Sequence, residues 1–163
     1  SYLEAKKKGS MSDEFYDKVV KISKRLNCNP DELMGVMNSE SCINHLAVNN
    51  KSNATGLIQF MPKTAISLGT TVDKLKTMSA VEQLDYVEKY LSIQKKAAGF
   101  ANNDRLALGD LYALVFLPGR AGRDVLTTSE EKYYSWNKGL DRNKDGKITK
   151  VELDTRVRTN FMA

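Results

Sequence analysis

Residues that form covalent cross-links or bind zinc are scarce in this sequence. The 163 residues include two cysteines and one histidine. Cys28 and Cys42 flank a segment expected to be helical, and a straight helix of that length would hold them roughly 20 Å apart, which is too far for a disulfide. We therefore expect two small buried thiols, with neither a disulfide framework nor a zinc site of cysteine and histidine ligands.

Long apolar runs are absent too. The longest are only a handful of residues, whereas a membrane-spanning helix needs roughly 20, so no membrane span is expected. The N-terminal region lacks the apolar stretch of a signal peptide, and residues 1–10, with three lysines before a Gly-Ser pair, are expected to be a tag or linker. Residues 11–163 are predicted to form a single domain.

The excess of positive charge is modest. A formal net charge of +5 favours a polyanionic partner but does not choose between nucleic acid, a membrane surface and the bacterial wall. Residues 1–10 carry three lysines and one glutamate, so the rest of the chain has a net charge of only +3. Its lysines are scattered and form no recognised nucleic-acid-binding motif, so nucleic acid is not expected as a partner.

Apolar residues recur at helical spacing along most of the chain. In residues 13–26 four of them repeat at intervals of four, three and four, with Ser12 as the expected N-cap. A second helix is predicted over residues 30–41, and a polar ordered loop over 44–55. Further helices are predicted over residues 62–69, from a capping box at 79–82 onward, and over 106–117. With no strand pattern of comparable strength, the sequence predicts a mainly α globule of five to seven helices.

Residues 141–152 match the twelve-residue EF-hand loop. The loop's positions 1, 3, 5, 7 and 12 place the expected ligands at Asp141, Asn143, Asp145, Lys147, through its carbonyl, and Glu152. Gly146 permits the sharp turn that wraps these groups around a hard cation. Sensor EF-hands work in pairs, and only a single loop of this kind is found, so we expect one structural Ca²⁺.

Glu40-Ser41 and a stretch at residues 56–62, Gly-Leu-Ile-Gln-Phe-Met-Pro, carry a resemblance to a known family. They resemble the soluble lytic transglycosylases, in which a glutamate and a serine end a helix and a Gly-Leu-Met-Gln-like stretch follows after a loop. Isoleucine in place of methionine, with Phe-Met-Pro after it, resembles the bacteriophage branch. The resemblance is specific over residues 36–65 and implies a lysozyme-like, goose-type helical fold with the EF-hand-like loop as a C-terminal addition.

The resemblance implies a lytic transglycosylase that cleaves the MurNAc-β-1,4-GlcNAc bond of peptidoglycan. Glu40 would protonate the leaving oxygen and then act as base on the sugar's 6-hydroxyl, which yields a 1,6-anhydro sugar. Its place at the C-terminal end of an apolar helix favours a raised pKa, because the helix dipole and partial burial both disfavour the charged form. No Asp or Glu occurs between Glu40 and Asp73, although a distant carboxylate such as Asp85 could fold into place.

Three residues near Glu40 in the sequence are candidates for binding the glycan. Gln59 matches the family's cleft-lining glutamine, with capping of the loop as the alternative. Asn49 stands where the family commonly has a serine and can donate to an N-acetyl carbonyl. Ser41 matches the serine beside the acid, and a hydrogen bond to its own helix backbone is the alternative role.

The family's active-site tyrosine has no direct counterpart. The family usually carries this tyrosine in an Ala-Tyr-Asn-Ala-Gly-Pro-Gly-like segment. When the Pro-Gly of that segment is aligned with Pro118-Gly119, the position of the tyrosine is occupied by Leu114. Tyr86 and Tyr112 are the candidates to fill the gap, and core packing is the alternative for each.

Two other function classes stay open. A goose-type-like lysozyme would release reducing-end products that are heavier by one water. A non-catalytic, calcium-dependent wall-binding module would show no dependence on Glu40. All three readings have peptidoglycan glycan strands as the partner and a monomer as the expected state. The lack of an export signal fits a phage-encoded or virion-associated protein acting on the wall from the periplasm or the exterior, and it also fits an excised domain.

Overall fold

The computed structural model describes residues 12–162 and is mainly helical in that range. The expected tag or linker at residues 1–10 lies outside the described residues. Within them are eight α-helices, which exceeds the predicted five to seven, three shorter helical segments and a two-stranded sheet. None of the described helices is both long and apolar enough to cross a membrane.

Two capped helices begin the fold. Helix α2 (Asp13–Leu26) starts at Ser12, whose hydroxyl accepts the backbone N–H of Phe15, and it buries the predicted apolar face. Helix α3 (Pro30–Ser41) starts at Asn29, whose side chain accepts two backbone N–H groups. Both helices have the predicted bounds, because local capping and apolar periodicity agree there.

A loop and three helices follow α3: α4 (Pro62–Ser67), α5 (Val72–Thr77) and α6 (Ala80–Ala97). The loop is irregular, as predicted, and is held by isolated bridges that pair Thr55 with Val48 and with Phe60. The buried Gln83 of α6 ties it down, accepting from the Leu57 N–H at 3.1 Å and donating to the His45 carbonyl at 2.7 Å. The predicted capping box opens α6.

The rest of the chain forms α7 (Leu108–Phe116), a short 3₁₀ turn (Pro118–Arg120), and a set of short elements. We call residues 125–157 the C-terminal lobe. It contains β1 (Val125–Thr128), α8 (Lys132–Trp136), a 3₁₀ turn (Lys138–Leu140), β2 (Lys147–Thr149) and α9 (Lys150–Val157). A π-helical turn (Arg158–Met162) follows α9. Strands β1 and β2 pair antiparallel. The sequence predicted none of these lobe helices or strands, because each is too short to show a period.

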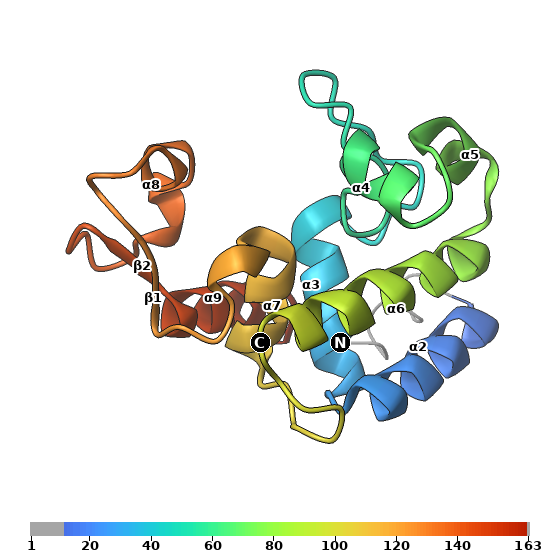
Figure 1. The fold of residues 1–163 in the computed structure, drawn as a ribbon, viewed down its shortest axis with the longest axis horizontal. Coiled ribbons are helices and arrows are strands. Elements are labelled where there is room, and N and C mark those ends of the chain that lie inside the picture. The colour runs from blue at the N-terminus through green and yellow to red at the C-terminus, as the bar shows by residue number, and fades with distance from the viewer. Residues whose placement is uncertain (1–11, 163) are drawn as a thin grey trace.

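Two glycines let α9 approach the helices that carry the site. A Cβ atom on Gly35 of α3 would lie 2.4 Å from a methyl carbon of Val157, and one on Gly109 of α7 would lie 2.6 Å from the Lys150 carbonyl oxygen. Such distances are sterically forbidden, so glycine at both places allows the close packing. In Figure 1 the C-terminal end of α3 lies between the C-terminal lobe and the α4 region.

The thiols differ from expectation. Cys28 is half-buried, and burial raises the pKa of its thiol to about 11. Cys42 is exposed, so the prediction of a buried thiol is wrong there. The reason is that Cys42 is the C-cap of α3, where a left-handed φ of 56° turns the chain outward.

Candidate active site

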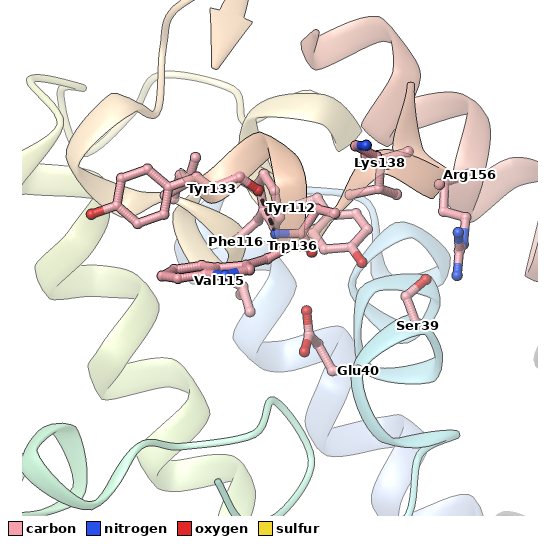
Figure 2. Close-up of a pocket in the computed structure, with 13 residues that line it drawn as sticks. Ser39, Glu40, Tyr112, Val115, Phe116, Tyr133, Trp136, Lys138 and Arg156 are labelled. Atoms are coloured by element: carbon pink, nitrogen blue, oxygen red, sulfur yellow. Dashed lines mark hydrogen bonds between the residues drawn. The ribbon is translucent and has the colours of Figure 1, made fainter. Parts of the chain in front are cut away.

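The last turn of α3 presents Glu40 to a cavity of about 580 Å³. One wall comes from α3, α7 and the residue after α7: Ser39, Glu40, Tyr112, Val115, Phe116 and Leu117. The opposite wall comes from the C-terminal lobe: Tyr133, Trp136, Asn137, Lys138, Gly139, Leu140 and Arg156. Figure 2 shows the carboxyl group of Glu40 pointing from α3 toward Val115, Trp136 and Tyr112. The acid therefore lies between two parts of the chain that are distant in sequence.

Burial raises the pKa of Glu40 to about 7. Burial alone accounts for this shift, because low polarity around a carboxyl group disfavours its charged form. Among the described residues that line the cavity, Glu40 is the single carboxylic acid. Asp85, the distant acid considered from sequence, instead pairs with Lys18 at 3.0 Å and is mostly exposed. A fraction of Glu40 is therefore neutral near pH 7 and can donate a proton.

Two tyrosines share the surroundings of Glu40. Tyr112 of α7 is buried and lines the cavity, and burial with the negative charge of Glu40 raises its pKa to about 12. Tyr90 of α6 has its pKa raised to about 12 by the same two causes, and its hydroxyl donates to the Leu114 carbonyl at 2.6 Å. Both phenols thus stay protonated around the acid and can act as hydrogen-bond donors. The sequence named Tyr112 as a candidate. It did not name Tyr90, although Tyr90 lies in the stretch 82–91 that also resembles the family.

Ser41 and Gln59 link the acid's helix to the loop. The buried hydroxyl of Ser41 has the Met37 carbonyl at 3.1 Å and the Leu57 carbonyl at 2.8 Å, so it bonds its own helix and also ties α3 to the loop. The amide nitrogen of Gln59 donates to the carbonyls of Ala47 and Gly56, which is the loop-capping role. Gln59 also lines a separate small cavity of about 60 Å³ with Tyr90 and Val115. Because Val115 lines both cavities, Gln59 lies next to the Glu40 cavity.

Of the five predicted glycan-binding residues, Tyr112 alone lines the cavity that holds Glu40, and Ser41 and Gln59 bind the loop instead. Asn49 is exposed, and its side chain accepts the backbone N–H groups of Lys51 and Ser52 in a local turn. Tyr86 is half-buried against the core on α6. Neither residue lines the cavity that holds Glu40.

The lobe side of the cavity was missed entirely from sequence. Trp136, Tyr133, Lys138 and Arg156 reach the cavity from short elements of the C-terminal lobe. An exposed aromatic residue in a five-residue helix has no periodic neighbours, so there was no pattern of apolar residues to detect. The single tryptophan of the chain was the one available hint.

The predicted metal loop packs directly behind that lobe wall. Carboxylate oxygens of Asp141, Asp145 and Glu152 lie within 4.8 Å of one another, which is the kind of hard-oxygen cluster that Ca²⁺ accepts. Gly146 has a φ of 81°, and its N–H donates to Asp141 at 2.9 Å. The residues present therefore fit a Ca²⁺ ion.

The other features of the loop agree with this fit. Asn143 is exposed, and its side-chain oxygen accepts the backbone N–H of Asp145 at 3.3 Å, inside the loop. Lys147 begins β2, and the buried Ile148 beside it pairs with Thr127 of β1. The loop is thus joined to the rest of the lobe through the sheet.

Comparison with known proteins finds one family model that matches part of the chain. Residues 18–98 match the family model described as "Transglycosylase SLT domain". This match supports a lytic transglycosylase or lysozyme-like family, and with it an enzyme of the bacterial wall that acts on peptidoglycan. The matched segment runs from within α2 to the residue after α6, so it contains Glu40 and Gln59 and excludes Tyr112 and the C-terminal lobe. No curated protein and no solved structure matches the chain.

Proposed function

We propose that this protein is a peptidoglycan lytic transglycosylase that cleaves the MurNAc-β-1,4-GlcNAc bond with Glu40 as both acid and base. The observation that carries the proposal is a half-buried carboxyl group with a pKa of about 7 in a cavity large enough for part of a glycan strand. An acid in glycosidic cleavage must hold its proton near the pH at which it works. The environment of Glu40 meets that requirement.

The reaction proceeds in two proton transfers. Glu40 first donates its proton to the glycosidic oxygen as the bond from that oxygen to the MurNAc C1 breaks, through an oxocarbenium-like transition state. The resulting carboxylate then removes the proton of the C6 hydroxyl while that oxygen bonds to C1. A 1,6-anhydro ring forms, Glu40 regains its proton, and no water is consumed. Tyr112 and Tyr90 remain neutral throughout, so they do not add negative charge beside the developing carboxylate.

The lack of a second carboxylic acid among the described residues that line the cavity favours this lyase route over hydrolysis. Hydrolases normally place a second carboxylate about 5 to 9.5 Å from the acid, as nucleophile or as base for water. Among the described residues that line the cavity, Glu40 has no such partner. An internal nucleophile, the substrate's own hydroxyl, removes the need for one.

Mass spectrometry of purified peptidoglycan digested by the wild type and by Glu40→Gln tests the proposal. We expect soluble anhydromuropeptides from the wild type and none from the variant. Reducing-end products, heavier by one water, would assign the protein as a lysozyme. Release of neither product by the wild type, with retained wall binding, would assign it as a binding module. The initial rate of the wild type should also fall as the pH rises through about 7, because Glu40 then loses the proton that it must donate.

We also propose that the loop at residues 141–152 holds one structural Ca²⁺, with Asp141, Asn143, Asp145, Glu152 and the carbonyl of Lys147 as its ligands. The clustered carboxylates and the left-handed Gly146 support this proposal. The ion would neutralise the repulsion among Asp141, Asp145 and Glu152 and so stabilise the C-terminal lobe. A role in phage wall lysis or penetration stays a prediction from the residue pattern at 58–62.

A further inference from the structure

The lobe wall of the cavity exposes two aromatic rings. Trp136 has 70% of its surface exposed and Tyr133 has 44%. Their rings meet edge to face, with centroids 5.9 Å apart. Large aromatic side chains are usually mostly buried, so an exposed pair that lines a cavity indicates a surface for an apolar ligand face.

The structure holds this pair in place from behind. The guanidinium of Arg120 lies 5.4 Å from the centre of the Tyr133 ring. Arg120 is itself fixed, since it donates to both carboxylate oxygens of Glu131 and to the Leu126 carbonyl. The side chain of Asn137 donates to the Tyr133 carbonyl at 2.9 Å and so closes the end of α8. A surface held in this way loses little conformational entropy when it binds a ligand.

Two cations line the same cavity. Lys138 and Arg156 are exposed, and neither forms a salt bridge with another residue in the described range 12–162. Figure 2 shows both on the lobe side, with Arg156 beside Ser39 of α3. Cations without a protein counter-charge in a cavity favour an anionic group on the ligand.

We propose that Trp136 and Tyr133 form a saccharide subsite in which one N-acetylhexosamine ring of the glycan strand stacks, while Lys138 and Arg156 bind a carboxylate of its peptide stem. The proposal rests on the proposed function, because it assumes that the strand runs past Glu40. The C–H face of a sugar ring is apolar and fits an aromatic surface, and peptide stems carry the carboxylates that the cations require. Binding at the C-terminal lobe would thus determine which glycosidic bond of the strand lies beside Glu40.

Trp136 is the only tryptophan of the chain, so its fluorescence reports directly on this subsite. The inactive Glu40→Gln protein is titrated with a neutral hexamer of N-acetylglucosamine and with soluble peptidoglycan strands. We expect a saturable shift of the emission to shorter wavelength with both ligands, because a stacked sugar excludes water from the ring. Unchanged emission, whether the ligand binds elsewhere by calorimetry or does not bind, would overturn the subsite.

Variants separate the aromatic surface from the cations. In the Glu40→Gln background, Trp136→Ala should weaken binding of both ligands about tenfold by calorimetry, and Trp136→Tyr should recover most of that loss. Lys138→Gln and Arg156→Gln should each weaken binding of the peptide-bearing strands about fivefold and leave the hexamer unaffected. Lys132→Gln, an exposed lysine of α8 outside the cavity lining, is the matched control and should change neither. Equal losses on both ligands from the lysine and arginine variants would overturn the carboxylate contact.

These results remain distinguishable from those of the proposed reaction. If the wild type releases no anhydromuropeptides but Trp136 still responds to the hexamer, the lyase assignment fails and the subsite stands. If anhydromuropeptides form and Trp136 does not respond, the subsite fails and the reaction stands. An intact melting temperature in each variant confirms that the loss of binding does not come from unfolding.

Discussion

The two sides of the Glu40 cavity are built in different ways. One side presents the acid from α3, a capped twelve-residue helix within the segment that matches the SLT domain, and buried polar contacts from Ser41 and Gln83 hold the loop beside it. The C-terminal lobe presents Trp136 and Lys138 from elements of three to five residues. Such short elements have little stability of their own. The acid therefore depends on a conventional helical core, whereas the opposite wall depends on the two-stranded sheet and on the loop at residues 141–152.

The largest expected effect concerns the acid on the helical side. Glu40→Gln keeps the size and hydrogen-bonding capacity of the side chain but removes the proton that is transferred. We expect the rate of peptidoglycan solubilisation to fall by at least about 10³-fold, in the range attributed to general acid catalysis. Glu14→Gln, an exposed glutamate in the first turn of α2, is the matched control and should keep the wild-type rate. Comparable rates for Glu40→Gln and the wild type would remove Glu40 from the reaction.

Removal of calcium should lower the stability of the C-terminal lobe, which forms the other side of the cavity. At a Ca²⁺ concentration of 100 times the Kd, binding stabilises the folded state by about 3 kcal/mol. Chelation should therefore lower the melting temperature by several degrees, and Glu152→Gln should abolish the response to Ca²⁺. Asp73→Asn, an exposed carboxylate on α5, should keep the full response. A melting curve that chelator does not move would contradict the metal site.

The half-buried acid should also make the free energy of unfolding depend on pH. Burial raises the pKa of Glu40 to about 7 from an ordinary value of 4.5. The stability contributed by the neutral form is complete below about pH 4.5 and is lost as the pH rises through about 7. At pH 8 the always-neutral Glu40→Gln should be more stable than the wild type by roughly 3 kcal/mol in urea unfolding, and at pH 4 the two should be nearly equal. A difference that is the same at both pH values would mean that burial does not penalise the charge.

The smallest effect distinguishes the two tyrosines that the sequence proposed. Tyr112→Phe removes a hydroxyl beside Glu40 and should lower kcat roughly tenfold, the effect of losing one hydrogen bond. Tyr86→Phe, away from the cavity, should leave kcat unchanged. Steady-state kinetics on purified peptidoglycan measures both. The reverse order of effects would place the glycan along α6 instead of α7.

The difference between the α3 side and the C-terminal lobe also explains how much of the structure could be predicted from sequence. The bounds of α2 and α3 followed from apolar periodicity and side-chain caps, and Glu40 followed from a motif that lies close together in the chain. Asn49 does not line the cavity, because its side chain lies in a local turn that its distance from Glu40 in the sequence does not reveal. Cys42 was misjudged because its burial depends on a left-handed cap that periodicity cannot show.

The lobe could not be predicted because its structure depends on long-range contacts. Strand β2 pairs with β1 across some twenty residues, and their side chains show no alternation long enough to detect. The cavity residue Arg156 lies on α9, which packs closely on Gly35 of α3 and Gly109 of α7. Glycine in a helix carries no sequence signal for what packs against it. The metal site at residues 141–152 stays a prediction, which rests on a ligand spacing encoded within twelve consecutive residues.

Carbon-13 NMR of the Glu40 carboxyl group tests the central claim most directly. Glutamate labelled at the carboxyl carbon gives one signal per residue, and the signal that disappears in Glu40→Gln identifies the acid. We predict that its chemical shift titrates with a midpoint near pH 7. A midpoint near pH 4.5, the ordinary value for a solvated glutamate, would contradict the account, because Glu40 would then have no proton to donate at neutral pH.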